Sequence, residues 1–462
     1  MNRKSTSAVN VISLIGLLVI PAPWAMAQLP TGVALKMNPG TVDNIGQIEI
    51  ADPGNHSWKL QSSTNLSIWT DVETWKVHNG RFVKSIPRAA APLAQYFRTV
   101  YDPAQQTAAT TLLNGVALPT PIANYANPAL PPGFLVAPIT TQDNTPPTNP
   151  VTNPAATLGR VLFYDKRLSA NNTVSCASCH RQENGFSDPR RFSVGFAGGS
   201  TARNSMGLTN ARWYQRVKFF WDERAATLEA QTLQPIQNAI EMGMTLPALE
   251  VKLSAEPYYQ ALFTNAFGTS AVTSDRISRA LAQFVRSIIS TQTKFDAGVA
   301  VGFSNFTAEE NLGRQIFNTP NQGGCAACHG TDNFVPGPNI NNNGLENPYI
   351  DKGVGALTGL PQDEGLFKVP SLRNIELTAP YMHDGRFATL EQVVEFYNSG
   401  VVNHPNLSPP LKNPPNAPSP GAPRRLNLTA AQKAALVAFL KTLTDPVLIS
   451  NPKFSDPFVY GN

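Results

Sequence analysis

The spacing of apolar residues changes along the chain, and the change marks two kinds of structure. In the N-terminal part, residues 57–62, 68–72, 81–83 and 96–100 are short β-rich stretches, and the first of them alternates between polar and apolar positions. Several short strands at this spacing predict a small all-β sandwich module over residues 28–101.

After Leu158, apolar residues recur at three- and four-residue intervals, which is the pattern of amphipathic helices. The clearest examples are residues 225–240 and 274–291. A last helix is predicted after Thr429, whose hydroxyl suits an N-cap. The pattern therefore predicts that the remainder of the chain is mainly α-helical.

Two proline-rich stretches interrupt these patterns. Residues 102–155 contain many prolines and few charges, which predicts an extended, semi-rigid linker rather than a folded core. A second proline-rich insertion, residues 405–423, precedes the last helix. We expect no catalytic residue in the linker.

Residues 1–27 have the composition of a secretory signal peptide. Arg3 and Lys4 precede an apolar stretch over residues 9–20, and Ala25-Met26-Ala27 forms a small-x-small cleavage site. The alternative is an uncleaved membrane anchor, but polar residues and prolines leave too short an apolar run for a span. We therefore expect cleavage near Ala27 and a mature protein without a membrane span.

The overall composition excludes several classes of protein. Of the 462 residues, 42% are hydrophobic and 15% are charged, which excludes a wholly disordered chain. The formal net charge is only +5 and no lysine–arginine cluster is present, so nucleic-acid binding is not expected. Four cysteines are too few for a disulfide scaffold in a chain of this length.

All four cysteines belong to two copies of the pattern C-x-x-C-H, the attachment signature of c-type haem. In such sites two thiols bond to the haem vinyl groups and the histidine is the proximal iron ligand. The alternatives are two disulfides, a redox dithiol, which would not need both histidines, or a zinc ribbon, whose Cys pairs lie about 15–20 residues apart. The pairs here lie more than a hundred residues apart. The sequence therefore predicts two covalently bound c-type haems, held by Cys176, Cys179 and His180 and by Cys325, Cys328 and His329.

Similar segments precede the two motifs. Residues 158–163 read LGRVLF and residues 312–317 read LGRQIF, at comparable distances before each motif. This internal repeat predicts two related cytochrome c-like haem domains, residues 156–300 and 301–450, followed by a tail over residues 451–462.

The region from Leu158 to Asp445 resembles the bacterial di-haem cytochrome c peroxidases, including their MauG-like branch. The resemblance is carried by the segments LGRVLFYDKRLSANNTVSCASCHRQENGFSD, FFWDERAATLEAQTLQPIQNAIEMGM, FKVPSLRNIELTAPYMHDGRFATLEQVVEFYN and LTAAQKAALVAFLKTLTD. It implies that the N-terminal haem activates hydrogen peroxide and that the C-terminal haem relays electrons or stores an oxidising equivalent.

The resemblance also assigns roles to individual residues. Gln231, Pro235 and Glu241 match the peroxide pocket, in which the carboxylate would move a proton between the peroxide oxygens. Gln231 would hold the substrate or a water molecule. Trp221 matches a tryptophan between the haems, where an oxidisable ring can relay electrons. The alternatives are an ordinary helix-end carboxylate for Glu241 and a core aromatic for Trp221.

One expected residue is missing. Many family members close the first haem with a distal histidine, but no histidine lies between His180 and His329. In family members this histidine lies on the loop before the tryptophan that Trp221 matches. On that loop, Met206 is the only other side chain that could bind iron. We therefore expect the first haem to have an open or water-bound sixth position without reductive activation.

At the second haem, the resemblance points to Tyr397, which lies fourteen residues after His383. Many family members have methionine at this offset, whereas the MauG-like branch has an axial tyrosine. We expect Tyr397 to ligate the second iron opposite His329, and a phenolate would favour ferric iron. Ligation by His383, Met382 or His404 is the alternative.

The resemblance further implies one calcium ion between the domains. Thr378 and Pro380 match positions that bind calcium through backbone carbonyls, and Asn204 is the expected side-chain ligand.

Together, these features predict a periplasmic di-haem c-type oxidoreductase that reduces hydrogen peroxide at the N-terminal haem. Its electrons would come from a small c-type cytochrome or cupredoxin through the C-terminal haem. One alternative is MauG-like oxidation of residues on a partner protein. The other is a non-enzymatic di-haem electron-transfer cytochrome.

Overall fold

The structure is a computed structural model that describes residues 115–334, 340–414 and 421–459, and the backbone of the strands between Val9 and Leu113. The chain forms two compact units. The first comprises residues 1–122 and 455–462, and the second is Ala123–Phe454.

The first unit consists of antiparallel strands. A five-stranded sheet has the order β2-β1-β8-β5-β6, a three-stranded sheet has the order β3-β4-β7, and β9 pairs with β10. The strand stretches predicted from the sequence overlap β5, β6, β7 and β8; the sandwich and the cleavage of residues 1–27 stay predictions. The strands are β1 (Val9–Ser13), β2 (Leu18–Ile20), β3 (Ala34–Pro39), β4 (Asn44–Ala51), β5 (Ser57–Ser63), β6 (Thr70–Lys76), β7 (Arg81–Pro87), β8 (Tyr96–Tyr101), β9 (Thr110–Leu113) and β10 (Val116–Pro119).

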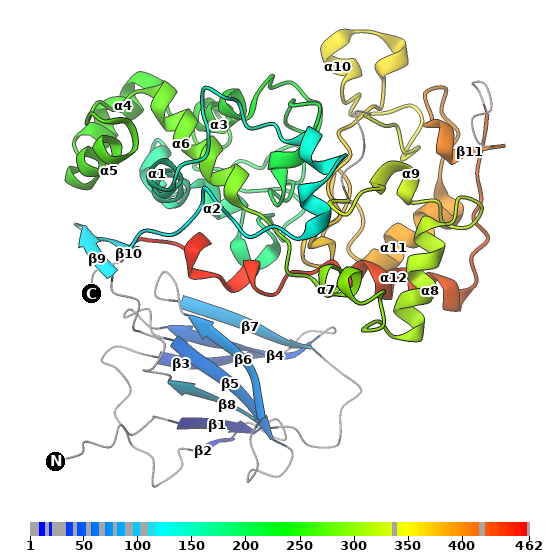
Figure 1. Ribbon diagram of the computed structural model, residues 1–462, viewed down its shortest axis with the longest axis horizontal. Helices are drawn as coiled ribbons and strands as arrows, with labels where there is room; N and C mark the ends of the chain where they lie inside the picture. Colours follow the sequence, from blue (N-terminus) through cyan, green and yellow to red (C-terminus); the bar gives the residue numbers. More distant parts are fainter. Residues whose placement is uncertain are drawn as a thin grey trace. The chain divides into compact units, whose positions relative to one another are not determined.

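The second unit is mainly helical, with α1–α6 on one side and α8–α12 on the other in Figure 1. The helices predicted around residues 225–240, 274–291 and after Thr429 correspond to α3, α6 and α12. Its elements are α1 (Asn153–Tyr164), α2 (Cys176–Cys179), α3 (Leu228–Gln237), α4 (Leu246–Ser254), α5 (Pro257–Phe267), α6 (Ser274–Ser287), α7 (Lys294–Ala300), α8 (Ala308–Asn318), α9 (Ala326–His329), α10 (Gly355–Thr358), α11 (Leu390–Glu395), α12 (Ala430–Lys441), β11 (Lys412–Asn413) and β12 (Ala422–Pro423).

A close helix crossing occurs twice in this unit. Helix α1 packs on α6, and α8 packs on α12. A Cβ atom added at Gly159 would overlap the Ala280 carbonyl and the Phe284 side chain. One added at Gly313 would overlap the equivalent atoms of Ala435 and Phe439. The glycine of the repeated segment therefore lets each helix approach the backbone of its partner.

The repeat extends into the loops that follow each motif. Asn210 and Asn374 both adopt a left-handed backbone, with φ of 58° and 61°. The side-chain oxygen of Asn210 accepts the backbone N–H of Ser290 at 2.7 Å, just beyond α6. That of Asn374 accepts the N–H of Asp445 at 2.8 Å, just beyond α12. The same loop-to-helix connection therefore holds both halves of the unit.

Part of the predicted linker belongs to the helical unit. Tyr125, Phe134 and Ile139 are buried, and the Phe134 ring packs edge-on against Trp213 with centroids 4.9 Å apart. The backbone is largely irregular, as the prolines predict. However, the apolar side chains between those prolines find a core to pack against, so residues 123–152 are not a simple connector.

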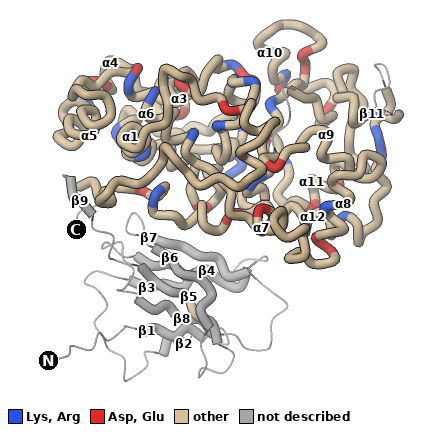
Figure 2. The backbone as a smooth tube through the Cα atoms, viewed as in Figure 1, with Lys and Arg blue, Asp and Glu red and all other residues tan. Residues whose placement is uncertain are grey.

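No helix among the described residues is both long and apolar enough to cross a membrane. In Figure 2, acidic and basic residues are interspersed along the described part of the chain, in keeping with the absence of a basic cluster in the sequence.

The crossing at Gly159 leads to a stability prediction. Alanine normally stabilises a helix relative to glycine, but here its methyl group would overlap α6. We expect Gly159→Ala to lower the free energy of unfolding by about 1–3 kcal/mol, measured by urea denaturation followed by circular dichroism. Gly199→Ala is the control, because its added Cβ would lie 3.5 Å from the Ile240 side chain, an ordinary contact. Equal stability of the two variants would contradict the close crossing.

Candidate active site

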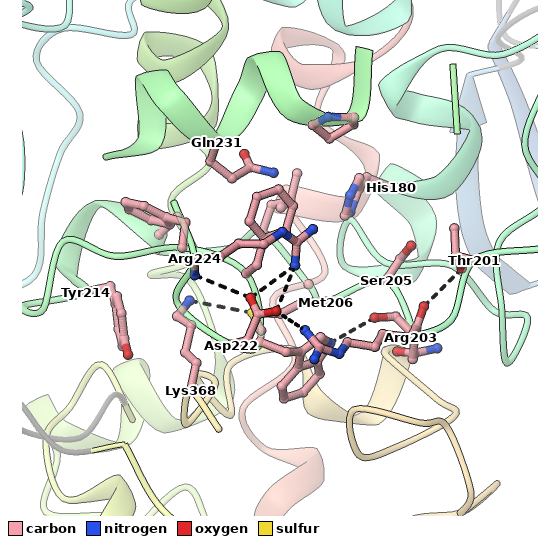
Figure 3. Close-up of a pocket in the computed structure, with 18 of the residues that line it drawn as sticks. His180, Thr201, Arg203, Ser205, Met206, Tyr214, Asp222, Arg224, Gln231 and Lys368 are labelled. Carbon is pink, nitrogen blue, oxygen red and sulfur yellow. Dashed lines mark hydrogen bonds and ion pairs between the residues drawn. The ribbon is translucent and has the colours of Figure 1, made fainter. Parts of the chain in front are cut away.

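A cavity of about 740 Å³ lies beside the first C-x-x-C-H motif. His180 follows α2, Gln231 and Pro235 lie on α3, and Glu241 follows α3; all four line the cavity. Figure 3 shows His180 and Gln231 from these two elements at the same cavity. Trp221 also lines it. The structure therefore brings together the residues that the sequence assigned to the peroxide pocket.

The two motif histidines have the same orientation in their turns. The Nδ1 atom of His180 lies 2.9 Å from the Phe186 carbonyl oxygen, and that of His329 lies 3.4 Å from the Phe334 carbonyl oxygen. A carbonyl can only accept, so Nδ1 carries the proton and Nε2 keeps its lone pair. Burial lowers the pKa of His180, and it lowers the pKa of His329 to about 4. Both imidazoles are therefore neutral and suited to bind a metal.

No disulfide joins any of the four cysteines, which are spaced one helical turn apart within each motif. Burial raises the pKa of Cys176 and of Cys325 to about 12. Cys176 and Cys179 line a second cavity of about 80 Å³ together with His180.

Glu241 is a partly buried carboxyl group at the cavity wall. Burial raises its pKa, and the charge of Arg224 opposes this shift without cancelling it. Arg224 itself is held by Asp222 at 3.0 Å and stacks on Phe220 at 3.6 Å from the ring centroid. Glu241 therefore holds its proton at higher pH than an exposed glutamate does, which suits a group that exchanges protons with a substrate.

Trp221 connects the cavity with the second half of the unit. Its Nε1 donates to the Asn204 carbonyl at 2.9 Å, and its ring lies edge-on to His383 with centroids 6.5 Å apart. It packs against a buried cluster that also contacts Met382 and Tyr397. The members of this cluster are Leu345, Tyr349, Phe367, Phe396, Val401 and Leu407.

Tyr397 lies in a π-helical turn, η9 (Phe396–Gly400), directly after α11. Burial raises its pKa, a hydrogen bond from Asn343 opposes the shift, and the thiols of Cys328 and Cys325 are near enough to add to it. The Asn343 amide also donates to the Met382 sulfur at 3.5 Å. The partly buried phenol therefore lies in the surroundings of the second motif.

His383 and His404, the two histidines that could bind the second iron instead of Tyr397, have other contacts. The Nδ1 atom of His404 accepts the Asn406 N–H at 3.0 Å, which leaves the proton on Nε2. His383 stacks on Phe367 with centroids 3.9 Å apart, and its Nε2 lies 3.8 Å from the Asp351 carboxylate.

An ion-pair network joins the two halves near Trp221. Arg203 donates to Asp351 through Nε at 2.6 Å and Nη2 at 2.8 Å, and to Asp222 through Nη1 at 2.5 Å. Asp222 also pairs with Arg224. Arg203 holds the pKa of Asp351 below its usual range despite the burial of that carboxyl. The local sequence pattern does not predict this network, because its members are distant in the chain.

Comparisons with known proteins agree with this geometry. Residues 153–301 match the family model of the di-haem cytochrome c peroxidases. The chain is 32% identical over 298 residues to the methylamine utilization protein MauG of Methylophilus methylotrophus, a match that covers 64% of this chain and 84% of that protein. The chain belongs to the di-haem cytochrome c peroxidase family.

Two further comparisons extend this assignment. The cytochrome c551 peroxidase of Nitrosomonas europaea is 35% identical over 293 residues, covering 63% of this chain and 79% of that protein. A crystal structure of a MauG-like protein associated with microbial copper homeostasis has a TM-score of 0.61 at 34% identity, and covers 72% of this chain and 99% of that chain. The family predicted from the sequence is therefore confirmed, and with it the prediction of a peroxide-dependent oxidoreductase.

The residues around both motifs fit the c-type haems of a di-haem peroxidase. Each motif supplies two cysteine side chains that form no disulfide and a neutral histidine whose Nδ1 is engaged by a carbonyl. Such a contact orients the ring and strengthens Nε2 as a ligand. The first motif also adjoins a cavity within the size range of ligand pockets.

The calcium prediction concerns residues near Trp221. The Asn204 amide nitrogen donates to the carbonyls of Arg190 and Arg191 at 3.1 and 3.3 Å. Thr378 and Pro380 follow the turn η8 (Ile375–Leu377). The described residues hold no group of three or more His, Cys, Asp or Glu that could bind a metal. Backbone carbonyls would have to supply most ligands, and calcium binding stays a prediction.

The Arg203 network leads to a second stability prediction. Arg203→Met would leave Asp222 and Asp351 without their shared partner, and these carboxylates are only 8% and 29% exposed. We expect the free energy of unfolding to fall by about 1–3 kcal/mol in chemical denaturation. Asp275→Asn is the control, because Asp275 is 72% exposed and its pair with Arg279 should contribute less than about 1 kcal/mol. If Arg203→Met were as stable as Asp275→Asn, the network would contribute little to the free energy of unfolding.

Proposed function

We propose that the protein is a periplasmic di-haem oxidoreductase that reduces hydrogen peroxide at the haem attached to Cys176 and Cys179. The electrons pass through the haem attached to Cys325 and Cys328. The observation that carries this proposal is the cavity at His180, which is lined by both Gln231 and Glu241. These side chains supply a hydrogen-bonding amide and a proton-exchanging carboxyl group to one enclosed space.

When bound, the first haem would supply a redox-active iron to which peroxide could bind. Glu241 accepts a proton from one peroxide oxygen and returns it to the other, so that cleavage of the O–O bond releases water rather than hydroxide. The reduction of one peroxide to two waters consumes two electrons and two protons. Gln231 holds the peroxide or the product water, and Pro235 shapes the wall beside it.

Trp221 provides the electronic connection between the two halves. Its ring lines the first cavity and packs on the cluster that contacts Tyr397. Its N–H is bound to a backbone carbonyl, which is too weak a base to remove the proton. An oxidised Trp221 would therefore keep its proton, and electron transfer through the ring needs no proton acceptor.

Tyr397 would bind the iron of the second haem, which His329 would also hold. Its burial near Cys325 and Cys328 supports this, and so do the contacts that engage His383 and His404 elsewhere.

A second candidate function is the MauG-like oxidation of residues on a partner protein. The tyrosine at position 397 and the lack of a distal histidine favour this electronic design. In the first candidate function, a small c-type cytochrome or cupredoxin donates the electrons. A purely electron-transferring cytochrome is less well supported, because it has no use for an open cavity lined by Gln231 and Glu241.

The direct test is the reaction of the as-isolated diferric protein with peroxide in stopped flow. We expect prompt Soret changes without prior reduction, because the sequence has no histidine between His180 and His329 to close the first haem. Glu241→Gln should slow the reaction by about 10²–10⁴-fold. Glu183→Gln is the control, since Glu183 is exposed and does not line the cavity.

The rate of the peroxide reaction should also depend on pH through the protonation of Glu241. The carboxylate form of Glu241 accepts the first proton, so the rate should fall as the pH drops through its raised pKa. This fall should begin at a higher pH than the value of about 4.3 for an ordinary glutamate. Spectral changes that require prior one-electron reduction would refute the open site. A Glu241→Gln variant with normal rates would remove Glu241 from the mechanism.

The ligation by Tyr397 can be tested separately. Tyr397→His should raise the reduction potential of the second haem and change its magnetic circular dichroism spectrum, because a neutral imidazole stabilises ferric iron less than a phenolate does. Tyr349→Phe, in the same buried cluster, should leave the spectrum unchanged. A sulfur ligand or a second imidazole in the wild-type protein would contradict the assignment.

A further inference from the structure

Lys368 is a buried cation that the proposed mechanism does not use. It is 9% exposed and lines the cavity beside His180. Its amine donates to the Met206 sulfur at 3.5 Å and lies 4.1 Å from the centroid of the Tyr214 ring. Figure 3 shows the amine directed toward Met206 among the residues that line the cavity. The ammonium group therefore faces the space that the first haem would fill.

The other cations of the cavity already have carboxylate partners. Arg203 pairs with Asp351 and Asp222, and Arg224 pairs with Asp222. Within the described residues, no carboxylate forms an ion pair with Lys368.

The acidic residue that acts on Lys368 electrostatically is Glu223. Arg216 holds Glu223 at 2.7 Å, and the Tyr214 hydroxyl donates to it as well. A thioether and an aromatic ring are weak partners for an ammonium group. Burial lowers the pKa of Lys368 to about 8, which reflects this poor compensation. The site therefore has a cation without a matching anion.

The haem brings such an anion, because each haem carries two propionate carboxylates. We infer that Lys368 forms an ion pair with a propionate of the first haem, in a subsite that the second half of the unit contributes to the first. This inference depends on the proposed function only in placing the first haem in this cavity. Peroxide is uncharged near neutral pH and would not supply the missing anion.

The position of Lys368 in the chain gives this ion pair a second role. The Lys368 backbone N–H donates to the Trp221 carbonyl at 2.8 Å. Lys368, which would hold the edge of the first haem, is thus hydrogen-bonded to Trp221, which we propose to carry electrons. A positive charge at a propionate also favours ferrous over ferric haem, so Lys368 would raise the reduction potential of the first haem.

The test compares Lys368→Met with Lys453→Met in the holoprotein. Lys453 is a matched control, because its pKa is also lowered to about 8 by burial and its amine lies over the Tyr125 ring, outside the cavity. We expect Lys368→Met to shift the propionate bending band in resonance Raman spectra and to lower the reduction potential of the first haem. The second haem should be unchanged. Lys453→Met should alter neither property, and Lys368→Arg should restore the wild-type band.

Two outcomes would overturn the inference. One is an unchanged propionate band and potential in Lys368→Met. The other is the same shift in Met206→Leu, which would show that the lysine only holds the sulfur. The second haem's spectrum reports whether each variant is folded, and Lys368→Gln, which is polar but uncharged, takes the place of Lys368→Met if that variant does not fold.

A free anion is the other possible partner of Lys368. Adding acetate to the dialysed wild-type protein should leave the propionate band unchanged, and a shift would favour a free carboxylate and overturn the inference. These readouts need only attached haem, so a protein that failed to react with peroxide would refute the proposed function and not this ion pair.

Discussion

The arrangement of the helical unit depends on a close backbone contact between two helices, made once in each half. At Gly159 and Gly313 the partner helix places a carbonyl where a side chain would otherwise lie. The contact aligns α1 with α6 and α8 with α12, and the residues just beyond α6 and α12 are then held by Asn210 and Asn374. Each C-x-x-C-H turn follows the first helix of its pair, so the position of both motif histidines depends on this packing.

The chemistry arises where the two halves differ. In the first half, α3 contributes Gln231 and Pro235 and the turn after it contributes Glu241, which together surround a cavity at His180. In the second half, α11 runs into a π-helical turn that carries Tyr397. A repeated framework thus holds one open pocket and one site with a partly buried phenol. Such a division suits a protein that reacts with a small oxidant at one cofactor and stores or passes electrons at the other.

Charged side chains link the two halves. Arg203 joins Asp222 of the first half to Asp351 of the second, and the Lys368 amine enters the cavity of the first half from the second. Charges in a medium of low dielectric interact strongly and are costly when unpaired. The two halves therefore depend on each other for charge compensation, and Trp221 lies at the place where they meet.

The sequence by itself determined the features that are local in the chain. Two C-x-x-C-H motifs, the repeated LGR segments and the helical periodicity were enough for the haem motifs, the long helices and the family, because short motifs and helix patterns depend on neighbouring residues. The resemblance also selected Trp221, Gln231, Pro235 and Glu241, which the structure brings to one cavity. The β sandwich, signal peptide, calcium ion and Tyr397 ligation stay predictions.

Only the tertiary structure decided which distant side chains meet. Nothing in the local pattern distinguishes Lys368 from a surface lysine, and Arg203 and Asp351 are separated by 148 residues. The proline content predicts a connector for the residues after 122, because it describes the backbone and not the burial of Phe134 or Tyr125. Burial and ion pairing are set by the packing of the whole unit, and the local sequence pattern does not contain that information.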